Sequence, residues 1–317
     1  MRIPKGGIAF FDSGIGGMTV LDECTKHIKE EIFYYFGDNH HAPYGNLSPS
    51  KIRKYVLRAF CLFQKLKVKA VVIACNTATA ICIDELREKY TFPIIGAEPA
   101  VLLAAKAEKA GGEIFVFTTR ATYDSNRFRA LCANAQAIYP MVNLHLYPCD
   151  HLAGEIETHI EDRDFNYSQW LPNGHPSGIV LGCTHYVYIK EYIKEIYNCP
   201  IFDGNVGIAK RLKEALFAVS QEKNVNNRGE RPLEKKLQKN HPFLTTFRLI
   251  TEEKRKANKR SDFCRLKNRG TPLVEKGTAI FFLGKNARKN ARFYKQMFVL
   301  SNKKSKVVKN PKKIKKK

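Results

Sequence analysis

The stretch AVVIACNTATA (residues 70–80) indicates how this chain folds. A short apolar run, rich in β-branched residues, ends at Cys75, and small polar residues follow at once. This pattern predicts a buried strand that ends at a thiol, with a helix beginning directly behind it. The stretch GIVLGCTHY (residues 178–186) has the same arrangement around Cys183. Because such a thiol meets the free N–H groups and the positive end of a helix, we expect a lowered cysteine pKa and a role as base or nucleophile.

Two thiols at equivalent positions suggest two α/β units that each present one cysteine to a common cleft. The alternative is that both cysteines are small buried core residues, as free cysteines often are. Each thiol is followed by its own polar cluster, Asn76 and Thr77 in one case and Thr184 and His185 in the other. The pair of clusters favours the functional interpretation.

Strand-like and helix-like segments alternate from residue 6 to about 210. The expected strands are 8–11, 32–36, 70–74, 93–95, 114–117, 144–147, 178–182 and 199–202, and amphipathic stretches such as 48–66 and 98–110 lie between them. This alternation predicts an α/β fold with parallel sheets flanked by helices. Ligands of such sheets bind at the carboxyl ends of the strands, which is where the polar clusters fall.

The formal net charge of +24 belongs to one part of the chain. Residues 221–317 hold 30 Lys and Arg against 7 Asp and Glu, whereas residues 1–220 hold 24 against 23. We expect a charged insertion at about 221–275, a strand at 276–284, a helix at 289–300 and a disordered basic tail at 301–317. The nine cysteines show no metal-ligand spacing, and no segment is apolar enough to span a membrane. We therefore expect a soluble cytoplasmic protein without metal or disulfides.

Near the N-terminus, GGIAFFDSGIGGMTVL (residues 6–21) predicts a strand that ends at Asp12 and Ser13, then a glycine-rich turn and a helix. The glycines allow close backbone approach to a small anion. Thr19 stands where a dinucleotide fingerprint needs its third glycine, and the G-K-[ST] ending of a P-loop is missing. Two further polar segments, FGDNHHAPYG (36–45) and FTTRATYDS (117–125), also follow expected strands.

Taken together and in this order, D-S-G-x-G-G, G-D-x-x-x-x-P-Y-G, A-C-N-T-A and G-C-T-H resemble the glutamate racemase family of the cofactor-independent aspartate/glutamate racemase superfamily. The resemblance covers about residues 6–215 and, more weakly, 276–300. It implies two pseudo-symmetric α/β domains with the active site in the cleft between them, interconverting L- and D-glutamate for peptidoglycan synthesis. We expect one domain from 1–97 with about 208–300, and the other from 98–207.

By this resemblance Cys75 is the acid/base thiol for D-glutamate and Cys183 the one for L-glutamate. Asp12, His185 and, by a looser match, Glu157 assist them. The resemblance assigns substrate binding to Asp12, Ser13, Pro43, Tyr44, Gly45, Asn76, Thr77, Thr119, Thr122, Thr184 and His185. Inverting a stereocentre needs two acid/base groups on opposite faces, and thiols can be tuned to serve as either. The two-thiol arrangement makes a cofactor unnecessary, and the resemblance implies glutamate as the small-molecule substrate and a homodimer.

The chain departs from the family pattern in two places, and two alternative functions remain open. Thr118 stands where the family usually has glycine, and the 221–275 insertion and the tail lie outside the common pattern. One alternative is a racemase of aspartate or a related amino acid. The other, of a different class, is a basic nucleic-acid-binding protein whose tail contacts phosphates without sequence specificity.

Overall fold

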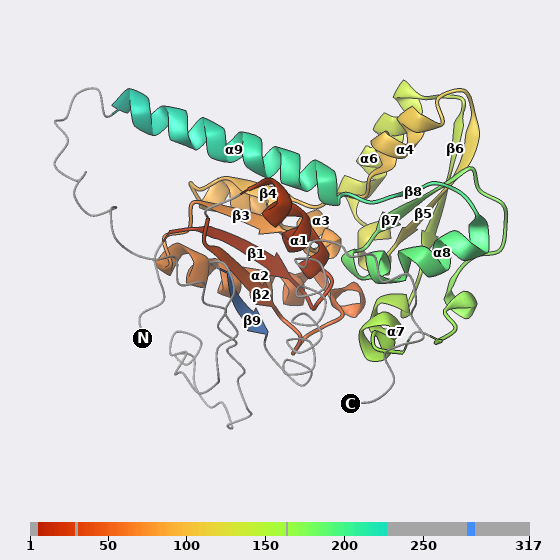
Figure 1. Cartoon of the computed structure of the whole chain (residues 1–317), viewed down its shortest axis with the longest axis horizontal. Helices are drawn as coiled ribbons and strands as arrows, with labels where there is room; N and C mark the ends of the chain where they lie inside the picture. The colour runs from red at the N-terminus through yellow and green to blue at the C-terminus, as the bar shows by residue number, and fades with distance from the viewer. Residues whose placement is uncertain (1–5, 29–30, 163, 227–277, 283–317) are drawn as a thin grey trace, which may run out of the picture.

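The computed structural model describes residues 6–28, 31–162, 164–226 and 278–282, and these form two parallel β-sheets with helices on their faces (Figure 1). The first sheet has the strand order β4-β3-β1-β2-β9 and the second the order β6-β5-β7-β8. The strands are β1 (Ile8–Asp12), β2 (Phe33–Gly37), β3 (Ala70–Ile73), β4 (Ile94–Gly96), β5 (Gly112–Thr118), β6 (Val142–Pro148), β7 (Gly178–Gly182), β8 (Ile201–Phe202) and β9 (Thr278–Phe282). Among the described residues the strand pairings of both sheets are parallel, which confirms the expected α/β class.

Helices cover both faces of each sheet, so the central strands are buried on both sides. The helices are α1 (Met18–His27), α2 (Pro49–Lys65), α3 (Asn76–Lys89), α4 (Val101–Ala107), α5 (Arg120–Tyr123), α6 (Asn126–Ile138), α7 (Leu152–His159), α8 (Lys190–Tyr197) and α9 (Asn205–Asn226). Short 3₁₀ helices are η1 (Tyr44–Asn46), η2 (Ser168–Trp170) and η3 (Thr184–Ile189). In the first sheet, Ile8 and Phe10 pack towards α1 and α9, whereas Ala9 and Phe11 pack towards α2 and α3.

The second sheet follows the same rule. Phe115 and Phe117 pack with α7, η3 and α8, and Ile114 and Val116 pack with α4 and α6. This alternation follows from the twofold period of a strand, which sends successive side chains to opposite faces. Each sheet therefore has a core on both sides.

Every expected strand is present within one or two residues of its predicted bounds, including β9, which pairs with β2. Two expectations need correction. Cys183 is followed by the 3₁₀ helix η3 rather than directly by an α-helix. The helix α9 continues to Asn226, into the expected insertion, because no glycine or proline interrupts the chain between Gly207 and Gly229.

The remainder of the 221–275 insertion, the helix expected at 289–300 and the tail at 301–317 lie outside the described residues. Within the described part of the chain, no helix has the length and apolar character needed to cross a membrane.

The chain passes between the two sheets through two crossovers. Residues 97–100 join β4 to α4, and residues 203–204 join β8 to α9, which returns along the first sheet (Figure 1). A Cβ added to Gly204 would lie 3.1 Å from the carbonyl oxygen of Glu98, so the two crossovers run side by side. Loops at the carboxyl ends of strands from both sheets meet beside them.

Candidate active site

The loop behind β1 holds a buried carboxylate. Asp12 is fully buried, and its Oδ2 accepts hydrogen bonds from the backbone N–H groups of Gly14 and Gly17, each at 3.1 Å. Its Oδ1 accepts from the Thr184 hydroxyl at 3.3 Å, which joins the first sheet to the second. Burial raises the pKa of Asp12, although His185 and the two amides act in the opposite direction. The expected small-anion loop therefore binds its own carboxylate.

Glycine is required where this loop meets the second sheet. A Cβ on Gly16 would lie 2.3 Å from Thr184 Oγ1 and 2.8 Å from the backbone nitrogen of His185. A Cβ on Gly14 would lie 2.6 Å from the Glu157 carboxylate. The glycines thus serve close packing between the two halves of the site as well as the turn itself.

Cys75 caps the N-terminus of α3, as the sequence predicts. Its sulfur accepts from the backbone N–H of Ala78 at 3.4 Å, and its thiol donates to the Ser13 hydroxyl at 3.7 Å. The expectation of a lowered pKa is wrong for this thiol. Burial, with only 5% of the residue exposed, and the nearby Asp12 carboxylate raise its pKa, and the helix N-terminus does not offset them. In this closed arrangement Cys75 is a protonated thiol near neutral pH.

Cys183 belongs to a chain of polar groups from the second sheet. Its sulfur lies 3.8 Å from His185 Nδ1, and His185 Nε2 lies 3.0 Å from Glu157 Oε2 on α7. Burial disfavours the imidazolium, but the hydrogen bonds to Cys183 and Glu157 outweigh it and raise the pKa of His185 well above its ordinary value. The raised pKa favours an imidazolium, which lies directly against the sulfur of Cys183.

Three threonines from both halves form a threonine cluster, Thr77, Thr119 and Thr122. Thr77 Oγ1 lies 2.8 Å from Thr119 Oγ1 and 3.4 Å from Thr122 Oγ1, and the last two lie 3.0 Å apart. Thr77 comes from the first turn of α3, whereas Thr119 and Thr122 come from the cap and first turn of α5. The T-x-x-T spacing therefore gathers its hydroxyls as expected, and they already bond to one another.

The P-Y-G segment approaches the second half through Pro43 and Gly45. A Cβ on Gly45 would lie 2.9 Å from Thr119 Cβ, and Pro43 Cγ lies 3.8 Å from the Cβ position of Gly154 on α7. The Tyr44 hydroxyl instead donates to Asp38 at 2.8 Å, and its ring packs against Phe11 in the core. Tyr44 therefore anchors the P-Y-G segment to the core of the first half.

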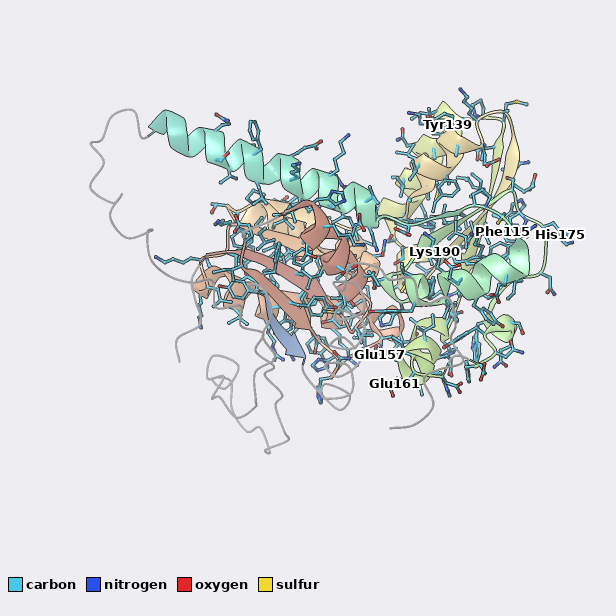
Figure 2. The ribbon with its side chains drawn as sticks, viewed as in Figure 1. Phe115, Tyr139, Glu157, Glu161, His175 and Lys190 are labelled. Carbon is cyan, nitrogen blue, oxygen red and sulfur yellow. The ribbon has the colours of Figure 1, made fainter. Side chains whose placement is uncertain are left out.

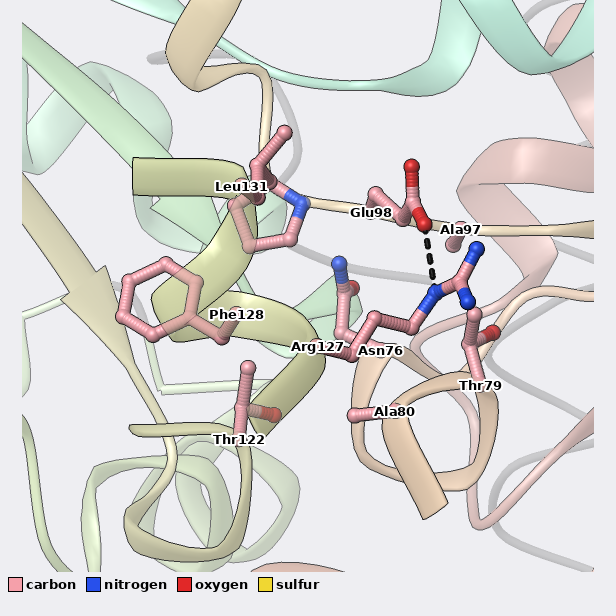
Figure 3. Close-up of a pocket in the computed structure, with 10 residues that line it drawn as sticks. Asn76, Thr79, Ala80, Ala97, Glu98, Thr122, Arg127, Phe128 and Leu131 are labelled. Atoms are coloured by element: carbon pink, nitrogen blue, oxygen red, sulfur yellow. Dashed lines mark hydrogen bonds and ion pairs between the residues drawn. The ribbon is translucent and has the colours of Figure 1, made fainter. Parts of the chain in front are cut away.

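Asn76 lines two small cavities beside the crossovers, each of about 10 Å³, which is room for one water. One of them is also lined by Cys183 and Thr184. The other lies beside Arg127, which donates to Glu98 at 2.6 Å (Figure 3). Arg127 also donates to Asp84 on α3 at 3.1 Å. Neither cavity has room for an amino acid.

Some residues that shape the site have no motif of their own. Asn39, behind β2, donates its side-chain Nδ2 to Glu157 Oε1. Tyr35 and Tyr188 donate their hydroxyls to the carbonyls of Gly14 and Ile15, at 2.7 and 3.0 Å, and hold the glycine loop from either sheet. Only the polarity of Asn39 at a strand end could have indicated its role.

This chain is similar to known proteins in both sequence and fold. The model of the Asp/Glu/Hydantoin racemase family matches residues 19–212. The glutamate racemase of Clostridium botulinum (strain Loch Maree / Type A3) is 38% identical over 225 residues, which is 68% of this chain and 86% of that protein.

Two solved structures are similar in fold. The Escherichia coli glutamate racemase in complex with L-glutamate and the activator UDP-MurNAc-ala has a TM-score of 0.61 at 26% identity, over 67% of this chain and 83% of that one. The Campylobacter jejuni glutamate racemase, at 23% identity, shows the same fold with a TM-score of 0.62 over 92% of this chain and 98% of that one. The chain therefore belongs to the Asp/Glu/hydantoin racemase family.

Proposed function

We propose that this protein interconverts L-glutamate and D-glutamate by transferring protons between two thiols and the substrate α-carbon, without a cofactor. One observation carries the proposal. Cys75 and Cys183 come from different sheets into one buried region, and each has separate polar partners: Ser13 for Cys75 and His185 for Cys183. The characterised relatives named above are glutamate racemases, which supports the choice of substrate.

The reaction needs one thiolate and one thiol at a time. In the L-to-D direction, the Cys183 thiolate takes the α-proton, so that a C–H bond breaks and an S–H bond forms. The electron pair passes to the α-carboxylate, and Cys75 returns a proton to the opposite face and becomes the thiolate. The D-to-L direction uses the same groups in reverse. The raised pKa of Cys75 suits its role as the proton donor in the first direction.

Binding groups surround this pair of thiols. The side chains of Ser13, Asn76 and Thr184 and the backbone N–H groups of Tyr44 and Gly45, which follow Pro43, offer donors for the charge that develops on the substrate. The threonine cluster is suited to bind the side-chain carboxylate of glutamate, because its three hydroxyls converge from both halves of the site. Asp12 anchors the glycine loop that faces Thr184.

We further propose that the site opens to admit substrate by bending at the two crossovers, residues 97–100 and 203–204. Cys75 is 5% exposed and Cys183 7%, and the threonine cluster is closed on itself. Arg127 links Asp84 on α3 to Glu98 in one crossover, so its ion pairs stabilise the closed arrangement. The homodimer implied by the resemblance stays a prediction.

A racemisation assay tests the proposed function directly. The full chain, dialysed and free of added cofactors, should racemise L-glutamate and D-glutamate and should act poorly on L-aspartate, as followed by circular dichroism. A preference for aspartate would favour the related racemase instead. Absence of racemisation of either amino acid would refute the proposal.

A further inference from the structure

The two oxygens of the Glu157 carboxylate contact side chains from opposite halves of the site. Oε2 contacts His185, which belongs to the second half of the site, and Oε1 accepts from Asn39, which follows β2 of the first. Glu157 lies on α7, beside the boundary between the two sheets (Figure 2), and only 7% of it is exposed. Donors on both oxygens fix the orientation of a buried carboxylate.

Among the residues that the structure describes, the Asn39 amide contacts Glu157 through its nitrogen and leaves its oxygen without a hydrogen bond. Within the described part of the structure its Oδ1 is buried and has no hydrogen-bond partner. Turning the amide over would bring Oδ1 against the Glu157 carboxylate, where two acceptors repel each other. The contact with Glu157 therefore fixes the amide orientation even though it leaves a buried acceptor unpaired, which is unfavourable.

We propose that Asn39 is a positioning residue: its amide holds the Glu157 carboxylate on His185 and thereby supports proton transfer at Cys183. This inference rests on the proposed function. Because Asn39 and Glu157 belong to opposite halves, the chain from Asn39 to Cys183 is complete only while the site is closed. Proton transfer at Cys183 is thus coupled to closure.

Removing the amide should weaken one of the two proton transfers. Among the described residues, the titratable groups that act on His185 are Cys183, Glu157 and Asp12. Without the Asn39 donor, the Glu157 carboxylate supports the imidazolium less well, and the proton affinity of His185 should fall about tenfold. The corresponding limb of the pH–rate profile should move to lower pH.

The kinetic signature follows from symmetry. The two enantiomers have equal free energies, so kcat/KM must fall by the same factor in both directions, about tenfold to a hundredfold. Isotope effects separate the two transfers. With the step at Cys183 slowed, the primary isotope effect on kcat/KM should rise for α-deuterated L-glutamate and shrink for α-deuterated D-glutamate.

The chain offers a matched control. Asn143 donates to Glu113 Oε1 at 2.8 Å, and Glu113 Oε2 contacts His145, so the same three residue types form an exposed chain on β5 and β6. Asn39→Leu, which keeps the side-chain shape, and Asn39→Ala are compared with Asn143→Leu and the wild type. Only the two Asn39 variants should lose activity and show the altered isotope effects.

A measurement that needs no turnover separates this inference from the proposed function. The His185 imidazole is titrated by NMR in the wild type and in both Asn39 variants, and its signal is assigned with His185→Gln. An unchanged His185 titration, or equal isotope effects for the two enantiomers, would overturn the role of Asn39. A wild type that does not racemise glutamate would refute the proposed function, and the titration would still decide the role of Asn39.

Discussion

A single methyl group at Gly16 should displace the segment that carries Cys183. The Cβ of Gly16→Ala would lie 2.3 Å from Thr184 Oγ1 and 2.8 Å from the His185 backbone nitrogen, whereas ordinary contact begins near 3.4 Å. Relief of this overlap requires a shift of about 1 Å. The His185 contact is with backbone, so rotation of one side chain cannot supply the whole shift.

A shift of this size should lower both the stability of the protein and its racemisation rate. Overpacking of this kind costs about 1–3 kcal/mol of unfolding free energy, and each kcal/mol lowers Tm by roughly 2–4 °C in a domain of this size. A misplacement of about 1 Å in an active site can cost about a hundredfold in rate. Racemisation should therefore fall much more than stability.

The assay compares Gly16→Ala with Gly207→Ala by glutamate racemisation and thermal unfolding. A Cβ on Gly207, in the first turn of α9, meets nothing within 4 Å, and alanine should be neutral there or stabilise by up to about 1 kcal/mol. If Gly16→Ala racemises glutamate at the wild-type rate and keeps its Tm, then the close packing of the glycine loop against Thr184 and His185 contributes to neither activity nor stability.

Four further predictions follow from the same structure. Cys75→Ser and Cys183→Ser should each abolish racemisation, because a serine hydroxyl is too weak an acid to cycle as a base, and solvent-deuterium exchange should be lost first for a different enantiomer in each; wild-type racemisation by either variant would contradict the two-base mechanism. Dialysis against a chelator and a carbonyl-trapping reagent should leave the rate unchanged, and a loss that one added cofactor restores would refute cofactor independence. Folding raises the pKa of His185, so the protonated imidazole contributes fully to stability below about pH 6.5, and this contribution is lost as the pH rises through the folded pKa. The unfolding free energies of wild type and His185→Gln should therefore converge with increasing pH. A difference between them that grows with pH would contradict a raised pKa for His185. Removal of residues 301–317 should leave the rate and Tm nearly unchanged and weaken any low-salt association with nucleic acid, since the segment holds nine lysines and no acidic residue; unfolding or loss of activity would show that it docks on the body.

The sequence predicts the fold well because the strands are short apolar runs that end in polar or small residues. The run before Cys75 and the run before Cys183 each locate a strand end, and parallel strands present such ends at one edge of a sheet. The thiols and the threonine cluster could therefore be expected together. The side-chain partner of Cys183, His185, stands two positions away in the same motif, whereas the partner of Cys75, Ser13, comes from the D-S-G-x-G-G motif.

What the sequence did not reveal depends on tertiary packing. The pKa of Cys75 is raised because two halves of the molecule exclude water from it, and no local pattern contains that information. Tyr44 lies in a recognisable motif, but its hydroxyl is taken up by Asp38. Asn39 meets Glu157 across 118 positions of the chain, and a single asparagine in a loop gives no indication of so distant a partner.

The threonine cluster has a consequence for selectivity. Because its hydroxyls bond to one another when the site is closed, a carboxylate that enters exchanges one set of hydrogen bonds for another, and the net gain for each is only about 0.5–1.5 kcal/mol. A ligand that separates the hydroxyls without a carboxylate to bind them leaves buried donors unpaired, at a cost of about 1–3 kcal/mol for each. Discrimination then arises chiefly from the penalty that falls on amino acids whose side chains end in the wrong place, and less from tight binding of the right one. Such a site can reject short or apolar amino acids and still release both enantiomers of its substrate readily.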